Sequence, residues 1–84
     1  MKPRTLALGD RNLIGARVTQ ARKAQNMKQH ELLAKLQTEG IEISSPALSL
    51  LEGQKRPVSD FELAALSKIL NVSVDWLLGN ESTQ

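Results

Sequence analysis

The feature that most constrains the fold is a capped helix start at Ser59. Ser59 and Glu62 stand three residues apart, the spacing at which a hydroxyl and a carboxylate satisfy each other's backbone N–H groups at a helix start. Val58 and Leu63 flank this capping box at the positions of a hydrophobic staple. The residues that follow repeat apolar side chains at helical spacing, which predicts a helix ending near Asn71: Leu63, Leu66, Ile69 and Leu70.

A second start signal lies directly after this helix. Ser73 is a good cap, and Val72 and Leu77 stand on either side of it in the staple relation. Gly79 is a typical residue for the end of a helix. The pattern predicts a short final helix between Ser73 and Gly79.

A further short helix is predicted before these two, from about residue 44 to Gly53. Ser44 as its cap makes a hydrophobic staple of the apolar residues at 43 and 48. Ser45 as its cap instead puts Pro46 at the first helical position, which proline favours. The sequence leaves both caps open.

Apolar spacing predicts two more helices in the first half of the chain. One covers roughly residues 11–25, with Asp10 or Asn12 as its cap. The other covers roughly residues 28–37, and the connection that follows it, residues 37–43, is expected to be a loop. The apolar residues of the two helices are Ile14, Val18, Ala21, Leu32, Leu33 and Leu36.

The fold class follows from this succession of helices without a convincing strand. We expect one all-α domain over residues 1–84, a compact five-helix bundle with flexible ends at 1–9 and 80–84. Met1 and the polar tail after Gly79 are expected to be the natural ends of the chain.

Composition excludes several classes of function. The chain has no cysteine, so it has no disulfide, no thiolate nucleophile and no cysteine zinc site. His30 is the single histidine, which argues against a metal site, and no nucleophile elbow accompanies it. No apolar run is long enough for a membrane span, and the N-terminus lacks a secretory signal. We therefore expect no enzyme activity, no cofactor and no metal, and a cytoplasmic location.

The charge is distributed unevenly along the chain. Residues 1–28 carry seven Lys or Arg and one Asp, a net charge of +6, whereas residues 29–84 carry four Lys or Arg and eight Asp or Glu, a net charge of −4. This asymmetry indicates a surface for a polyanion. A solvated basic helix face is the alternative.

Four segments of the chain resemble the phage-repressor and Cro-type helix-turn-helix family: residues 29–33, 44–52, 58–63 and 70–79. The most specific is the last, Leu-Asn-Val-Ser-Val-Asp-Trp-Leu-Leu-Gly. The resemblance implies a helix-turn-helix at about residues 28–53, whose second helix enters the major groove. It also implies a bacterial or phage-encoded regulator, a repressor that binds an inverted repeat in double-stranded DNA as a homodimer.

The resemblance implies roles for individual residues. Gln29 is expected against a phosphate, and Arg22 and Glu52 are expected to form a buried ion pair. Lys28, Lys55 and Arg56 flank the unit and are expected on phosphates. The full set expected at DNA is Lys28, Gln29, Ser44, Ser45, Ala47, Ser49, Leu50, Lys55 and Arg56.

Two departures from the family pattern support an alternative function. The turn at residues 37–43 is longer than the ~3–4 residues usual for this motif. The helix expected in the major groove, about residues 44–53, has no Arg, Lys, Asn or Gln, and the first such residue is Gln54. These are the side chains that read bases most specifically. The alternative is a protein-interaction module of the same fold that docks an antitoxin-like or other regulatory partner through Leu50 and the long turn.

The two ends of the chain carry further expectations. A dimer is expected to use the last helix through Trp76, Leu77 and Leu78, although Trp76 also fits a core position or, less well, a stacking platform for bases. Lys2 and Arg4 precede the first helix and form either a basic arm for an adjacent groove or a disordered tail.

Overall fold

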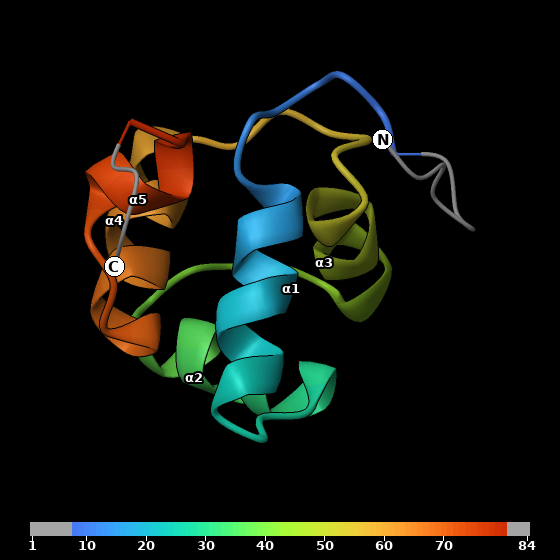
Figure 1. Ribbon diagram of the computed structural model, residues 1–84. Helices are drawn as coiled ribbons and strands as arrows, with labels where there is room; N and C mark the ends of the chain where they lie inside the picture. Colours follow the sequence, from blue (N-terminus) through green and yellow to red (C-terminus); the bar gives the residue numbers. More distant parts are fainter. Residues whose placement is uncertain (1–7, 81–84) are drawn as a thin grey trace.

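The computed structural model describes residues 8–80, and within that range it contains helices and no strand. In chain order the helices are α1 (Gly15–Ala24), α2 (Gln29–Thr38), α3 (Ser45–Glu52), α4 (Asp60–Leu70) and α5 (Val74–Leu78), as Figure 1 shows. The prediction of a five-helix all-α fold is confirmed. None of these helices has the length and apolar character needed to cross a lipid bilayer.

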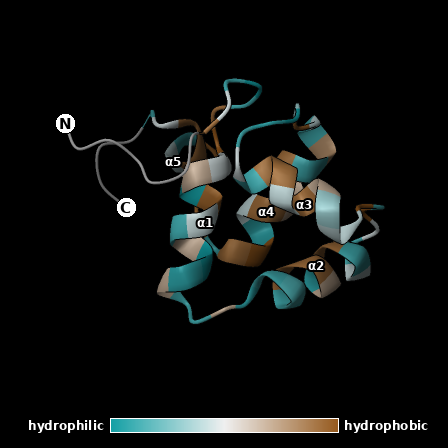
Figure 2. Ribbon diagram, turned by 90° about the vertical axis from the view of Figure 1, so that its right-hand side faces the viewer, coloured by the Kyte–Doolittle hydropathy of each residue, from teal (hydrophilic) through white to brown (hydrophobic). Residues whose placement is uncertain are grey.

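One apolar core holds the helices together. Every helix turns a hydrophobic side inward, and Figure 2 shows these sides meeting between α1, α2, α3 and α4. α1 contacts α3 and α4, α2 contacts the same two helices, and α5 packs on α4. Each fully buried aliphatic side chain contributes about 1.5–3 kcal/mol of transfer free energy. The largest are Val18, Leu32, Leu36, Leu48, Leu51, Leu66, Leu70 and Leu77.

Serine side chains begin three of the helices. Ser59 and Glu62 form the expected capping box: the Ser59 hydroxyl accepts from the backbone N–H of Glu62 at 3.1 Å, and the Glu62 carboxylate accepts from that of Ser59 at 2.9 Å. Ser73 caps α5 in the same way, accepting from the N–H of Trp76 at 2.9 Å. At α3 the cap is Ser44, whose hydroxyl accepts from the N–H of Ala47 at 3.2 Å. The open choice between Ser44 and Ser45 is thereby settled.

The first helix begins later than the sequence predicts. Asn12, and not Asp10, provides the start: its Oδ1 accepts from the N–H groups of Ile14 and Gly15 at 3.0 and 2.8 Å. α1 therefore starts at Gly15, about four residues after the predicted boundary. The cause is tertiary, because Asn12 Nδ2 donates to the backbone carbonyls of Leu51, in the last turn of α3, and of Arg56, which follows α3.

The connection between α2 and α3 is shorter than predicted. α2 continues to Thr38, so residues 39–44 link the two helices, six residues where seven were expected. The N–H groups of Gly40 and Ile41 donate to the carbonyls of Gln37 and Leu36 and close the end of the helix. Gly40 has φ +87°, a left-handed conformation that glycine adopts without strain. Ile43 is buried and anchors the end of the connection.

Candidate functional site

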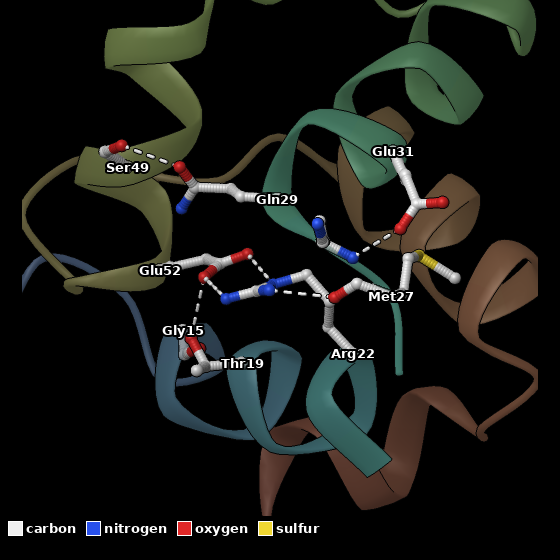
Figure 3. Close-up of polar contacts among 9 residues, drawn as sticks. Gly15, Thr19, Arg22, Met27, Gln29, Glu31, Ser49 and Glu52 are labelled. Carbon is white, nitrogen blue, oxygen red and sulfur yellow. Dashed lines mark hydrogen bonds and ion pairs between the residues drawn. The ribbon is translucent and has the colours of Figure 1, made fainter. Parts of the chain in front are cut away.

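The α2–α3 pair is joined at its exposed surface by one side-chain hydrogen bond. Gln29 is the first residue of α2, and Ser49 lies in the middle of α3. The Ser49 hydroxyl donates to Gln29 Oε1 at 3.0 Å (Figure 3). Gln29 Nε2 has no hydrogen-bond partner among residues 8–80, so this amide keeps two N–H donors for a ligand.

A buried ion pair fixes the far end of α3 on α1. Arg22 Nε and NH2 donate to the two carboxylate oxygens of Glu52 at 2.9 and 3.0 Å, and the side chains are 11% and 7% exposed. The expected Arg22–Glu52 pair is therefore present. Thr19 Oγ1 also donates to Glu52 at 2.9 Å, and Arg22 NH1 donates to the carbonyl of Met27 at 2.9 Å (Figure 3).

The network connects α1, the turn before α2 and the end of α3. Because Arg22 bonds the Met27 carbonyl, it holds the chain just before Lys28 and the first turn of α2. The Lys28 N–H in turn donates to Glu31 Oε1 at 2.7 Å, which steadies that first turn. The position of α3 relative to Gln29 thus depends on interactions below the surface as well as on the Gln29–Ser49 bond.

The surface of α3 carries hydroxyl and apolar groups. Ser45, Pro46, Ser49 and Leu50 are exposed, and Leu50 retains 45% of its accessible surface. Ala47 is half-buried against the core, and Ser44 is occupied as the helix cap. The one charged residue of α3, Glu52, is buried in its ion pair. This face can hydrogen-bond through serines and make methyl contacts, but it offers no bidentate side chain.

Cations lie at the margins of the α2–α3 pair. Lys28 and Lys55 are exposed, and neither forms an ion pair within the part of the chain that the structure describes. Arg56 differs from the expectation: its NH1 contacts Glu62 Oε2 at 3.2 Å, and the side chain is only 30% exposed. Arg56 is therefore held by the first turn of α4, whereas its sequence position alone indicated an unpaired cation.

Some of the positive charges in the first 28 residues are used for contacts within the molecule. Arg22 is neutralised by Glu52, and the guanidinium of Arg17 lies over the ring of Trp76, 5.1 Å from its centroid. Lys2 and Arg4 fall outside the described residues. The cations of this region that remain exposed without an ion pair in residues 8–80 are Arg11, Lys23 and Lys28.

Gln54 has a role that local sequence patterns could not reveal. Its Nε2 donates to the carbonyls of Asn12 and Gly9 at 3.0 and 3.4 Å, and its Oε1 accepts from the N–H of Ala16 at 3.4 Å. Its backbone carbonyl accepts from the N–H of Arg11 at 2.9 Å. Gln54 is thus engaged inside the molecule, about 40 positions from its partners in the sequence, and it does not extend the reading face of α3.

The expected dimer residues of α5 are mostly buried within one chain. Trp76 is 7% exposed and Leu77 is fully buried, and both belong to the apolar core. Leu78 is half-buried and is the member of the set that retains accessible surface. Trp76 therefore takes the core position that the sequence also allowed, and Leu78 keeps the most accessible surface of the three.

The described residues bring no group of three metal-ligating side chains together, and His30 is exposed on the first turn of α2. The fold and its surface define a small all-α bundle with a polar-bridged helix pair. No protein-family model, curated protein or solved structure matches the chain.

Proposed function

We propose that this chain is a DNA-binding transcriptional regulator, a repressor that binds an inverted repeat as a dimer. In this proposal α2 and α3 form a helix-turn-helix, with α3 in the major groove and the start of α2 on the backbone. The observation that carries it is the Gln29–Ser49 bond, which ties the start of α2 to the exposed face of α3 and leaves the Gln29 amide donors available for a phosphate. Such a regulator acts in the cytoplasm of a bacterium, encoded by the cell or by a phage.

The chemistry of the α3 face determines how sequence would be read. Ser45 and Ser49 can each make one hydrogen bond to a base edge, and Leu50 can contact the methyl group of thymine. Serine bonds to several bases, so much of the specificity in this proposal comes from the shape of the DNA. Lys28 and Lys55 contribute phosphate contacts that position the protein. Two such contacts per protomer give a slope of about +2 in log Kd against log salt for each half-site, because salt weakens binding.

The experiment begins with selection of bound duplexes from a random pool, followed by fluorescence anisotropy on the selected duplex. The double variant Lys28→Glu with Lys55→Glu should weaken binding at least about tenfold and flatten the salt dependence, since two phosphate contacts are lost. A matched control is Lys23→Glu with Lys35→Glu, which changes the net charge equally at exposed positions away from α3 and from the start of α2. Lys35 lies in the second half of α2 and lines a cavity with Lys68 and Ile69 of α4. Arg56 is left intact, because its reversal would set two carboxylates together at Glu62.

The proposal fails if the pool yields no enriched duplex, or if both double variants lose affinity equally. The second result would show that net charge alone, rather than a surface around α2 and α3, attracts the DNA.

A second candidate function is supported by the same face of α3. Leu50 is 45% exposed, and α3 bears no cationic or amide side chain. These properties suit a protein partner that docks on α3, as in a protein-interaction module of this fold. Under this alternative Leu50→Asp abolishes binding of the partner, whereas Lys28→Glu with Lys55→Glu leaves it intact and no duplex is enriched.

A further inference from the structure

An apolar groove lies at the edge of the molecule where the segment before α1, the segment before α4 and α5 meet. Figure 1 shows the first two of these segments running along the same edge, at the ends of α1 and α3. The cavity measures about 210 Å³, larger than the ~150 Å³ that accommodates a benzene molecule. We name it the apical groove and define it by its apolar rim: Leu13, Pro57, Val58, Leu63 and Leu78.

Leu13 is an apolar side chain of this rim that is strongly exposed to solvent. It is 74% exposed, although its neighbour Ile14 is 2% exposed and packs in the core. The backbone here is held by Asn12, whose Oδ1 accepts from the Ile14 N–H at 3.0 Å and whose Nδ2 donates to the Leu51 carbonyl at 3.1 Å. A backbone fixed by hydrogen bonds therefore presents an aliphatic side chain to solvent, so little backbone entropy remains to be lost when that side chain is buried.

We propose that the apical groove receives Leu13 of a second copy of this chain, and that two copies exchange Leu13 across a two-fold axis. Leu13 lines the groove from which it also projects, so one surface supplies both the inserted side chain and the place that receives it. A two-fold axis requires this self-complementarity, because the same patch of both copies meets there.

Two charges of opposite sign accompany the groove. Arg11 lines it, and Asp75 lies on α5 three residues before Leu78, which also lines it. Both are exposed, and neither forms an ion pair within residues 8–80. A two-fold rotation can bring Arg11 of one copy to Asp75 of the other, which favours a second copy over a partner of a single charge sign.

The surface is small, which determines the expected strength of the dimer. An interface made of five apolar side chains and the charges of Arg11 and Asp75 covers less than the ~800 Å² per partner of a standard interface. Free chains are therefore expected to associate weakly. Two copies held on neighbouring half-sites would dimerise at a much higher effective concentration. The inference deepens the proposed function by naming the dimer surface, but self-association is measured without DNA.

Sedimentation velocity of the full chain from about 10 µM to about 1 mM tests the proposal over the range expected for a weak interface. The wild-type chain should shift from monomer to dimer, and Leu13→Asp should weaken association at least tenfold. Phe61→Asp is the matched control, since Phe61 is 77% exposed and lines a different cavity, with Gly40 and Ile41. Thermal unfolding of both variants verifies that they fold.

Cysteine cross-linking provides a second measurement, because the chain contains no cysteine of its own. Under mild oxidation Leu13→Cys should form a covalent dimer at least tenfold faster than Phe61→Cys. A wild-type chain that stays monomeric throughout the range overturns the inference, and so does a dimer that is insensitive to Leu13→Asp. A dimer that enriches no duplex overturns the proposed function alone, whereas a chain that enriches an inverted repeat but stays monomeric without DNA overturns this inference alone.

Discussion

Glu52 joins three parts of the molecule through a single carboxylate. Its oxygens accept from Arg22 and Thr19 of α1, and Arg22 continues the network to the Met27 carbonyl. No buried side-chain nitrogen or oxygen in residues 8–80 lacks a hydrogen-bond partner. A satisfied buried pair of this kind contributes little net stability compared with an apolar pair, but removing one member leaves an uncompensated charge.

We predict that Glu52→Leu lowers the free energy of unfolding by about 3–5 kcal/mol, because it leaves the Arg22 guanidinium buried without its counter-ion. Urea denaturation measures the loss. The double variant Arg22→Met with Glu52→Leu should recover most of it, since both charges are then absent. A single variant within about 1 kcal/mol of wild type would show that Arg22 reaches solvent when unpaired.

Gln29 allows a separation of structural and DNA-binding roles at one residue. We predict that Gln29→Glu leaves an acceptor for the Ser49 hydroxyl but weakens DNA binding at least about tenfold, because a carboxylate replaces the free amide donors and repels phosphate. Fluorescence anisotropy measures affinity, and urea denaturation checks the fold. Gln20→Glu, at an exposed position of α1, is the control. Equal affinity of wild type and Gln29→Glu would argue against a phosphate contact at this position.

At the scale of the helices, capping serine side chains mark where α3, α4 and α5 begin. Ser44, Ser59 and Ser73 all have extended backbones at ψ between 154° and 164°, and each accepts a hydrogen bond from an N–H three residues ahead. Three helices therefore start where a short polar side chain can turn back onto the first helical turn. The cap of α3 matters for function, since Ser44 is occupied by it and Ser45 becomes the first residue of the proposed DNA-reading helix.

We predict that Ser44→Ala and Ser45→Ala differ in their effect on stability, although the two serines are adjacent. Ser44→Ala removes the hydroxyl that accepts from the Ala47 N–H and should cost about 1 kcal/mol. Ser45→Ala lies at the first helical position, is exposed and should change the free energy of unfolding by less than about 0.5 kcal/mol. Denaturant unfolding of both variants measures the difference, and the reverse order would place the helix start one residue later.

At the scale of the whole molecule, the chain before α1 is bound to the chain that leaves α3. The Gly9 N–H donates to the Gly53 carbonyl at 2.9 Å, and Asn12 Nδ2 donates to the carbonyls of Leu51 and Arg56 at 3.1 and 2.9 Å. A Cβ on Gly9 would overlap the Gln54 carbonyl, so this approach of two backbones requires a glycine. We call this contact between residues 9–12 and residues 51–56 the seam, and it fixes the backbone next to Leu13 and Lys55.

We predict that Asn12→Ala lowers the free energy of unfolding by about 2–3 kcal/mol, because two backbone carbonyls and two N–H groups lose their part-buried partner. The neighbouring Asp10→Ala, at an exposed position, should change it by less than about 0.5 kcal/mol. Urea denaturation compares them. Equal costs for the two variants would mean that the seam contributes no more than local turn geometry.

Much of the fold could be predicted because its signals are local. The helix starts at Ser59 and Ser73 depend on residues three or four positions apart, and both were confirmed. The apolar faces of α2 and α4 also lie toward the core as predicted, although Leu33, Leu63 and Ile69 are only half-buried there. The start of α1 was placed early because Asn12 is held by carbonyls about 40 residues away. The role of Gln54 escaped prediction for the same reason.

The predictions for the site residues likewise depended on whether the relevant contacts are local in the sequence. The Arg22–Glu52 pair was predicted from a family resemblance and is present in the structure, whereas spacing alone would not have paired residues 30 positions apart. Arg56 was expected on DNA, and folding brings Glu62 next to it. Trp76 was expected either in the core or at an interface, and folding places it in the core beneath Arg17. Charge and hydrophobicity read along a chain cannot tell which groups will neutralise or cover one another.

By itself, the sequence determined the number and order of the helices, the caps at Ser59 and Ser73 and the apolar faces of the core, because helix formation and capping are decided within a few residues. The tertiary structure alone decided which serine caps α3, which cations remain exposed and that Leu13 projects beside an open groove. Each of these depends on groups brought together from distant parts of the chain, and only close packing of the whole molecule specifies such contacts.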